Sequence, residues 1–322
     1  MPPYTAPERL LLRLEWRVLR RLEGRIAGGY RTVHRGVGTD LAGLRPYAEG
    51  DDARHIDWNV TARLNEPQLR VFNEDRELTA WLVLDHSACM TIGPPGRGKQ
   101  DVLGELAVLL ALMFSRSGNQ VGALLYDNGA VRTVPPGSGR RHVLHIAAAL
   151  ERADAAGRAK DSGNGRRQRR RGRSGGGPSG RAKHRGTTDL AGMLDAVAKL
   201  ARRRSLIIVI SDFIGSGDWE RSLLRLSPRH EVVALRVVDT ADDELPEVGL
   251  VVVEDAETGE QLILDSTDHV LRARFAEAVA ERDALLSAGM RRAGVPVHRI
   301  DTTADLATSL VEVVSSTRRR RL

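Results

Sequence analysis

The sequence has one cysteine, no long apolar run and no signal-peptide pattern at its start. A single cysteine excludes an internal disulfide and suits a reducing compartment, so we expect a cytoplasmic protein. A membrane-spanning helix needs about 18 or more apolar residues in succession, and no stretch of the chain approaches that length. The 322 residues, of which 41% are hydrophobic, are long enough to bury a sizeable core in one large domain or two modest ones.

The formal net charge of +7 is concentrated in one insertion and one tail. Residues 157–186 contain eleven Lys or Arg and a single acidic residue, Asp161, while residues 318–321 add four arginines. The rest of the chain has 34 basic and 41 acidic residues, so we expect a mildly acidic folded body. Because residues 157–186 have almost no core-forming side chains, they are predicted to be a disordered basic insertion.

The arginine-rich insertion leaves three roles open. It contains no aromatic residue, so it is able to bind nucleic acid by counterion release but without reading a sequence. An acidic surface of a partner protein is a second ligand of the right charge, and a solvated insertion without any ligand is the default for a charge run. The insertion alone therefore does not define a nucleic-acid-binding protein.

The chain divides into three regions by composition. Residues 1–29 contain a basic amphipathic helix at 7–27, and residues 30–78 hold short β-prone pieces rich in Gly, Asp and Arg. Residues 79–322 alternate between strand and helix patterns, and nearly continuous apolar runs such as 232–238 indicate strands covered on both faces. We therefore predict an α/β domain with a mostly parallel sheet and helices on both faces, preceded by a small β-rich segment.

The individual elements of the α/β domain follow from the period of its apolar residues. Strands are predicted at 79–85, 120–126, 131–134, 205–211, 231–238, 249–254 and 295–300. Helices are predicted at 99–117, 139–153, 189–203, 217–227, 268–291 and 304–316.

Polar side chains with oxygen atoms stand where two of these strands end. Asp85 and Ser87 come directly after the apolar run 81–84, Asp212 follows the strand at 205–211, and Thr188 precedes the helix that leads to that strand. In an open α/β sheet, ligands collect outside the carboxyl ends of the strands. Carboxylate and hydroxyl oxygens suit a hard cation such as Mg²⁺ or Mn²⁺. The sequence therefore predicts a divalent-cation site at this edge of the sheet.

The order Asp-x-Ser-x-Ser, then Thr, then Asp resembles the metal-ion-dependent adhesion site (MIDAS) of von Willebrand factor A domains. Two longer signatures resemble the bacterial family called domain of unknown function 58. One is 45–58 (RPYAEGDDARHIDW), followed by Ala62-Arg63, and the other is 239–246 (DTADDELP), followed by 255–260 (DAETGE). The resemblance covers about residues 30 to 300.

This resemblance implies a fold, a partner and a set of ligands. The fold is von Willebrand factor A-like, and the partner is a MoxR-type AAA+ ATPase that acts with such proteins in the assembly or maturation of client proteins. Asp85, Ser87, Thr188 and Asp212 match the metal-binding pattern position by position. Cys89 stands where the pattern has its second serine, and a thiol is a soft, weak ligand for magnesium. A degenerate site without metal, in which Cys89 is only a small buried residue, is the alternative.

Residues Gly93 to Gln100 fit the phosphate-loop spacing G-x-x-x-x-G-K. Gln100 stands where a Ser or Thr hydroxyl would hold magnesium, and the loop begins eight residues after Asp85 rather than directly on its strand. We therefore expect a Gly/Pro turn that leads into the helix beginning at Lys99, with a P-loop-like nucleotide-binding protein as the alternative.

Cys89 also raises the alternative of an enzyme with a cysteine nucleophile. Such a cysteine needs a lowered thiol pKa and an adjacent base, and His86 is the nearest histidine in the sequence. Nothing else in the sequence identifies a Cys–His pair. We predict instead a cytoplasmic, non-enzymatic protein-interaction module that acts with an AAA+ ATPase and a client protein.

Overall fold

The computed structural model describes residues 35–48, 51–73, 78–91, 97–171, 188–215, 218–254 and 260–319. These residues fall into two compact units, a smaller one from 35–73 and a larger one from 78–319. The amphipathic helix predicted at 7–27 lies outside the described residues.

The smaller unit is an antiparallel β-hairpin that encloses two short helices. Its elements are β1 (Arg35–Pro46), η1 (Ala53–His55), α2 (Trp58–Leu64) and β2 (Gln68–Asn73). Asp57 caps α2 by accepting hydrogen bonds from the backbone N–H groups of Asn59 and Val60, and Asn65 ends the helix in the left-handed conformation. The other carboxylate oxygen of Asp57 pairs with Arg70 on β2 at 3.0 Å, so one side chain ties α2 to the hairpin.

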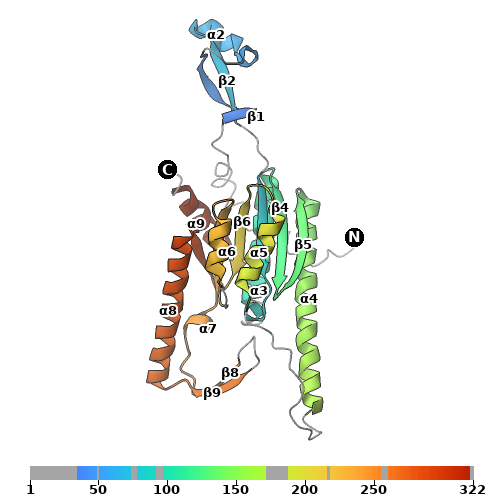
Figure 1. Ribbon diagram of the computed structural model, residues 1–322, viewed down its shortest axis with the longest axis vertical. Coiled ribbons are helices and arrows are strands. Elements are labelled where there is room, and N and C mark those ends of the chain that lie inside the picture. The colour runs from blue at the N-terminus through green and yellow to red at the C-terminus, as the bar shows by residue number, and fades with distance from the viewer. Residues whose placement is uncertain are drawn as a thin grey trace. The chain divides into compact units, whose positions relative to one another are not determined.

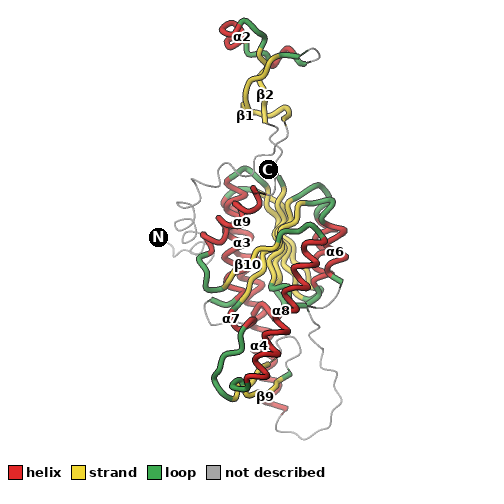
Figure 2. Tube along the Cα trace, turned by 90° about the vertical axis from the view of Figure 1, so that its left-hand side faces the viewer, coloured by secondary structure: helices red, strands yellow, loops and turns green. Residues whose placement is uncertain are grey.

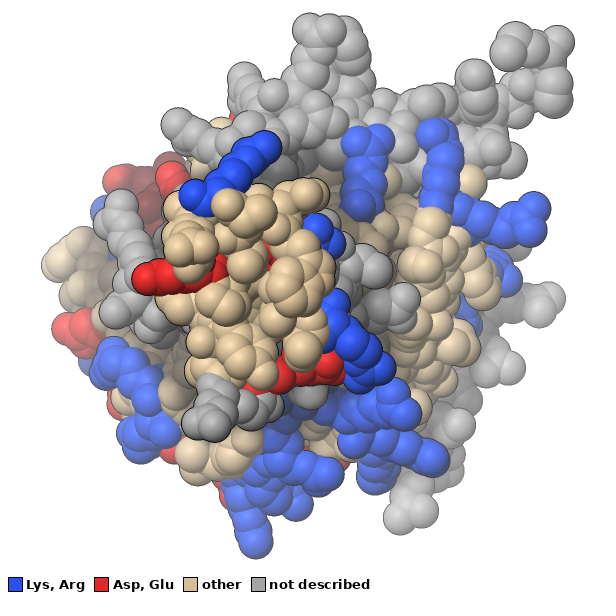
Figure 3. All heavy atoms as spheres, turned by 90° about the horizontal axis from the view of Figure 1, so that it is seen from above, with Lys and Arg blue, Asp and Glu red and all other residues tan. Residues whose placement is uncertain are grey.

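Charged side chains of the smaller unit form local pairs. Arg45 donates two hydrogen bonds of 2.6 Å to the carboxylate of Asp51, and Arg54 pairs with Asp52 at 2.7 Å. Figure 3 shows Lys and Arg side chains together with acidic and uncharged side chains among the described residues of the face that it presents.

The larger unit is built on a six-stranded sheet in the order β10-β7-β6-β3-β4-β5 (Figure 1). Five neighbouring strands are parallel, and β5 is antiparallel at one edge, which confirms the predicted α/β fold with a mostly parallel sheet. The strands are β3 (Thr79–Asp85), β4 (Gln120–Asp127), β5 (Ala130–Gly137), β6 (Leu206–Ser211), β7 (Glu231–Val238) and β10 (Val297–Asp301). The apolar runs in β3, β6 and β7 are buried because helices cover both faces of the sheet.

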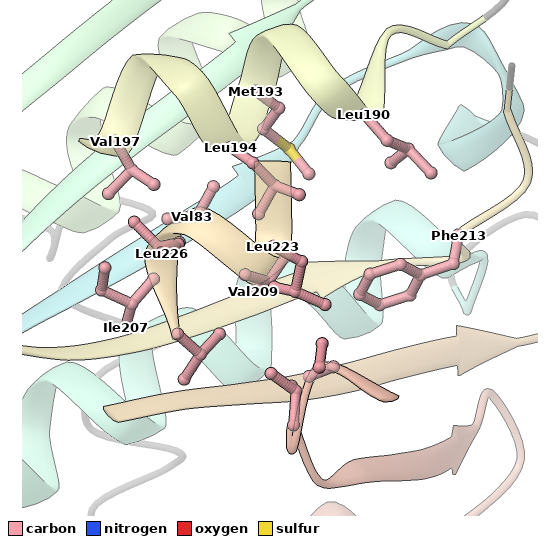
Figure 4. Close-up of a cluster of buried hydrophobic side chains, with 14 of the residues drawn as sticks. Val83, Leu190, Met193, Leu194, Val197, Ile207, Val209, Phe213, Leu223 and Leu226 are labelled. Carbon is pink, nitrogen blue, oxygen red and sulfur yellow. The ribbon is translucent and has the colours of Figure 1, made fainter. Parts of the chain in front are cut away.

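The helices follow the strands in alternation. They are η2 (Ala88–Thr91), α3 (Lys99–Arg116), α4 (Arg140–Arg171), α5 (Leu190–Leu200), α6 (Trp219–Leu226), α7 (Thr240–Asp243), α8 (His269–Arg292) and α9 (Leu306–Arg319). Figure 2 shows α3 and α9 on one side of the sheet and α6 on the other. The face under α5 and α6 is a core in which Met193 and Leu194 of α5 lie over Val209 of β6, with Phe213 beside Leu190 (Figure 4).

Two segments differ from the sequence-based expectations. The strand predicted at 249–254 is β8 (Leu250–Glu254), but it pairs with β9 (Gln261–Asp265) in a separate hairpin and not with the central sheet. Helix α4 continues to Arg171, so the prediction of disorder is wrong for residues 157–171. Ala, Lys, Gln and Arg are good helix formers, which favours the continuation of a helix that begins with an apolar stripe.

Within the part of the chain that the structure describes, no helix combines the length and the apolar character needed to cross a bilayer.

Candidate functional site

The candidate site lies at the carboxyl ends of the neighbouring parallel strands β3 and β6. Asp85 is the last residue of β3, Ser211 is the last residue of β6, and Asp212 follows directly. Asp85 and Asp212 expose no more than 1% of their surface, and Thr188, just before α5, is buried to the same degree. The parallel pairing therefore brings two carboxylates to one buried edge, as the sequence predicted.

Asp85 is held in place by two neighbours. Its Oδ1 accepts a hydrogen bond from the backbone N–H of Ser87 at 2.9 Å, and its Oδ2 accepts one from Ser211 Oγ at 2.6 Å. Burial, and then the negative charge of Asp212, raise the pKa of Asp85 to about 6 despite these hydrogen bonds. The carboxylate is therefore oriented but carries a charge that its surroundings do not fully compensate.

Ser87 presents a buried hydroxyl to the same site. Its side chain is 1% exposed, and its Oγ makes no hydrogen bond of regular geometry to any residue that the structure describes. The hydroxyl nevertheless lies close enough to the carboxyl group of Asp85 to lower the pKa of that group. Apart from this contact the buried hydroxyl has no hydrogen bond of regular geometry, and buried polar groups are usually satisfied, so its oxygen is available as a ligand.

The backbone after β6 is strained at the site. Phe213 has a φ of 56° although it is not a glycine, and its side chain is buried in the core under α5 and α6 (Figure 4). Its backbone N–H donates to Ser211 Oγ at 2.9 Å, and the N–H of Ile214 donates to Asp212 Oδ1 at 2.9 Å. Such strained positions concentrate at functional sites, where the surrounding structure holds them.

Thr188 lies against the loop that follows Asp212. A Cβ added to Gly215 would stand 2.5 Å from the carbonyl oxygen of Thr188, so only a glycine permits this close approach. The next residue, Asp189, caps α5 by accepting from the N–H of Gly192 and also accepts a hydrogen bond of 3.0 Å from Tyr126. The structure thus brings Thr188 next to the Asp212 loop, while Asp189 has a capping role.

Lys99 is a site residue whose role the sequence did not reveal. It is the first residue of α3 and is fully buried, with its Nζ 2.8 Å from Asp212 Oδ2 and 3.1 Å from Asp242 on α7. Burial alone would lower the pKa of the ammonium group, but the charges of Asp212 and Asp242 outweigh it and raise that pKa. The only signals in the sequence were a lysine at the start of an apolar helix and an aspartate within the signature 239–246.

The charges of this cluster leave room for a divalent cation. Asp85, Asp212 and Asp242 supply three negative charges and Lys99 one positive charge, so the buried group has a formal charge of −2 when all are ionised. Among the described residues, no three His, Cys, Asp or Glu side chains are placed to hold a metal ion. Hydroxyl and water oxygens would therefore have to complete the coordination, and the Ser87 hydroxyl fits that need.

Cys89 lies in η2, directly after the buried turn. Its side chain is half-buried, whereas Asp85 and Ser87 are fully buried. His86 is directed elsewhere: its Nδ1 lies 3.1 Å from Gln100 Nε2 and 3.6 Å from Asp154. Burial lowers the pKa of His86 to about 4, which makes it a weak base. These contacts do not favour a Cys–His nucleophile.

The residues of the phosphate-loop spacing are engaged in structural contacts. Arg97 donates hydrogen bonds to the backbone carbonyl groups of Thr302 and Ala304, at 2.6 and 2.7 Å. Lys99 is ion-paired inside the protein, and Gln100 donates to Asp154 at 2.6 Å. The loop at 92–96 lies outside the described residues. The geometry of 97–100 therefore favours a turn that anchors α3.

Uncharacterised mycobacterial proteins are similar to this chain over nearly all or part of its length. The chain is 35% identical to one from Mycobacterium tuberculosis over 313 residues, covering 96% of this chain and 89% of that protein. A second uncharacterised protein, from Mycobacterium avium, is 40% identical over 136 residues, covering 42% of this chain and 79% of that protein.

Two solved structures resemble the chain more distantly. One is the conserved hypothetical protein BatB from Bacteroides thetaiotaomicron, with a TM-score of 0.40 and 13% identity, covering 75% of this chain and 99% of that one. The other is an aerotolerance-related membrane protein from Bacteroides fragilis, with a TM-score of 0.41 and 14% identity, covering 74% and 97%.

A family of bacterial proteins matches most of the folded chain. The match extends over residues 43–285, from β1 of the smaller unit to α8 of the larger one. It therefore includes both sequence signatures and every residue of the candidate site. Together with the mycobacterial relatives, this match shows that the chain belongs to the family described as protein of unknown function DUF58.

Proposed function

We propose that this chain is a non-enzymatic protein-interaction module of von Willebrand factor A type, which binds a divalent cation at Asp85, Ser87, Thr188 and Asp212. The observation that carries the proposal is the buried Ser87 hydroxyl, which makes no regular hydrogen bond to a described residue and lies beside carboxylates whose charge Lys99 only partly balances. A cation such as Mg²⁺ would be coordinated by the Ser87 hydroxyl oxygen and would supply the missing positive charge.

The protein's own residues prepare this site. Ser211 and the Ser87 backbone fix the orientation of the Asp85 carboxylate, and the strained Phe213 fixes the direction of the Asp212 loop. Lys99 donates a hydrogen bond to Asp212 Oδ2, and Asp212 Oδ1 accepts a hydrogen bond from the backbone N–H of Ile214. A bound cation would offer an open coordination position to an acidic side chain of a partner protein, next to the half-buried Cys89.

The proposed partner is a MoxR-type AAA+ ATPase, and the proposed process is assembly or maturation of a client protein in the cytoplasm. Support comes from the signatures at 45–58 and 239–246, which resemble those of proteins that act with such ATPases. The larger unit contributes Asp242 of the second signature to the Lys99 ion pair, which links that signature to the candidate site.

Calorimetric titration tests the cation. Adding Mg²⁺ or Mn²⁺ to chelator-treated protein should give a saturable heat that Asp85→Ala abolishes, because the variant removes an oriented carboxylate. Ser87→Ala should weaken binding roughly tenfold or more, as expected for the loss of an oxygen ligand or of its support. Cys89→Ser should bind several-fold more tightly, because a hydroxyl is the harder ligand.

A matched control for Ser87→Ala is Ser205→Ala. Ser205 is also buried, but it precedes β6 at the opposite end of the strand and donates to the Arg203 carbonyl. Its replacement should leave the binding curve unchanged. If wild-type protein produces no heat with either cation, the metal site is refuted, and equal affinity of wild type and Cys89→Ser would show that residue 89 does not face the cation.

Binding to a purified MoxR-type ATPase from the same organism tests the partner. We expect a complex with the full chain on size-exclusion chromatography in Mg²⁺, and a clearly smaller complex peak with Asp85→Ala. Wild type and Asp85→Ala are compared in the same Mg²⁺ buffer. The ATPase therefore keeps its own magnesium in both measurements. A complex that forms equally well with wild type and Asp85→Ala would refute a metal-dependent contact, and no complex at all would refute the partner.

A further inference from the structure

Both carboxylate oxygens of Asp212 already accept hydrogen bonds inside the protein. Oδ1 accepts one from the backbone N–H of Ile214 at 2.9 Å, and Oδ2 accepts one from Lys99 Nζ at 2.8 Å. The backbone N–H is neutral, whereas the ammonium group places a full positive charge next to the carboxylate. A divalent cation on the same carboxylate would therefore be repelled by Lys99 in its present position.

Lys99 is unable to leave the site altogether, because its backbone is anchored. It is the first residue of α3, and Gly98 before it donates its N–H to the side chain of Asp101 in the first turn of that helix. Arg97, one residue earlier, donates a hydrogen bond of 2.6 Å to the carbonyl group of Thr302. Any displacement of the ammonium group is therefore confined to rotations of the flexible lysine side chain.

Asp242 of α7 provides a second position for the same ammonium group. Both of its carboxylate oxygens lie 3.1 Å from Lys99 Nζ. Its Oδ2 also accepts a hydrogen bond of 3.1 Å from the backbone N–H of Asp239, the residue that caps α7. Asp239 in turn accepts a buried hydrogen bond of 2.7 Å from the Thr302 hydroxyl. The Asp242 carboxylate is therefore fixed next to Lys99 independently of Asp212.

The neighbouring acidic residue on α7, Asp243, has different partners. Its carboxylate pairs with Arg282 of α8 at 3.1 Å and with Arg299 of β10. Asp242 and Asp243 therefore carry the same charge on the same short helix, but of the two it is Asp242 that forms the ion pair with Lys99. This difference allows the contact to be separated from the general effect of charge.

We infer that Lys99 is a tethered counter-cation, which a divalent cation displaces from Asp212 and which Asp242 then retains. This role rests on the proposed cation site, whose affinity it sets. Without the cation, the ammonium group limits the repulsion between the buried carboxylates; with the cation, it stays paired with Asp242 alone. Because the cation has to replace an existing ion pair, Lys99 lowers the affinity of the site.

Calorimetric titration of variants of the full chain tests this role. Lys99→Met removes the competing charge and should bind Mg²⁺ roughly tenfold more tightly than wild type. Asp242→Asn removes the second position, so Lys99 should stay on Asp212 and the variant should bind roughly tenfold more weakly. Asp243→Asn is the matched control, because it removes the same charge from α7 without a contact to Lys99, and its affinity should remain within about twofold of wild type.

The ammonium signal of Lys99 gives a second readout, which does not depend on the stability of Lys99→Met. Among the lysines whose side chains the structure describes, Lys99 is buried and Lys199 is exposed. In wild-type protein that contains isotope-labelled lysine, Mg²⁺ should shift the NMR resonance of the Lys99 ammonium group, because its hydrogen bond to Asp212 is lost. The resonance of Lys199 should stay in place.

The results distinguish the role of Lys99 from the existence of the cation site. If wild type binds Mg²⁺ and Asp242→Asn binds it equally well, the role of Lys99 is overturned while the cation site stands. The same holds if Asp243→Asn weakens binding as much as Asp242→Asn, or if saturating Mg²⁺ leaves the Lys99 resonance unchanged. An absence of heat in wild type and in every variant would overturn the cation site and the role of Lys99 together.

Discussion

Replacing Lys99 by methionine is expected to destabilise the protein by about 3–5 kcal/mol at neutral pH without divalent cations. The reason is the full burial of the ammonium group between Asp212 and Asp242. Methionine fills a similar volume but leaves two carboxylates without their counter-charge. Urea unfolding of wild type and variant, followed by circular dichroism in a chelating buffer, measures the difference.

Two further variants separate the ion pair from general packing. Lys199→Met replaces an exposed lysine on α5 and should change the free energy of unfolding very little. Adding Asp242→Asn to Lys99→Met should restore part of the lost stability, because one uncompensated charge is removed. If Lys99→Met costs less than about 1 kcal/mol, Lys99 does not balance buried carboxylates as the structure indicates.

Replacing Asp85 by asparagine is expected to stabilise the metal-free protein at pH 7.5 by up to about 3 kcal/mol. The pKa of Asp85 is about 6 in the folded protein, against 3.8 for an ordinary aspartate, because of burial and the charge of Asp212. Ionising this group at pH 7.5 therefore opposes folding. Asparagine keeps the shape without the charge, and the Ser211 hydroxyl is able to turn and accept a hydrogen bond from its amide.

The pH dependence has a defined sign. Between pH 3.8 and about 6, the folded state keeps the Asp85 proton that the unfolded state loses, so wild-type stability falls as pH rises through this window. Asp85→Asn lacks this contribution. The stability difference between variant and wild type should therefore grow from pH 5 to about 7 and then stay constant, as unfolding in a chelating buffer over that range will measure.

Magnesium provides the complementary measurement. Added Mg²⁺ should raise the melting temperature of wild type at pH 7.5, because it removes the cost of the ionised carboxylate, and should not raise that of Asp85→Asn. Asp195→Asn serves as a control, since Asp195 forms an exposed ion pair with Arg225 and such pairs contribute little. A variant less stable than wild type at every pH would show that the Asp85 charge is already compensated.

We expect these two residues to have opposite effects on stability, as the proposed role of the site in binding would require. Asp85 carries a destabilising charge, and Lys99 limits the same kind of cost at Asp212. A fold optimised only for stability would replace both by apolar residues. The presence of both charged groups at one buried strand edge is consistent with the proposed cation site.

Much of the larger unit was predictable from the sequence because its strands and helices have clear apolar periods. The strands at 79–85, 206–211 and 231–238 were predicted to within one residue, since continuous apolar runs between turn residues have few other interpretations. Asp85 and Asp212 were predicted to meet because the carboxyl ends of parallel strands share an edge. The length of α4 was not predicted, because a polar helix carries no apolar period beyond its buried part.

The sequence by itself therefore determined the α/β alternation, the mostly parallel sheet and the edge at which Asp85 and Asp212 meet. Only the tertiary structure decided that Lys99 neutralises Asp212, that Ser87 is left without a regular hydrogen bond, and that β8 pairs with β9. The physical reason is the range of the interactions. Periodicity is read over a few neighbouring residues, whereas an ion pair across 113 positions and the burial of one hydroxyl depend on how distant elements pack.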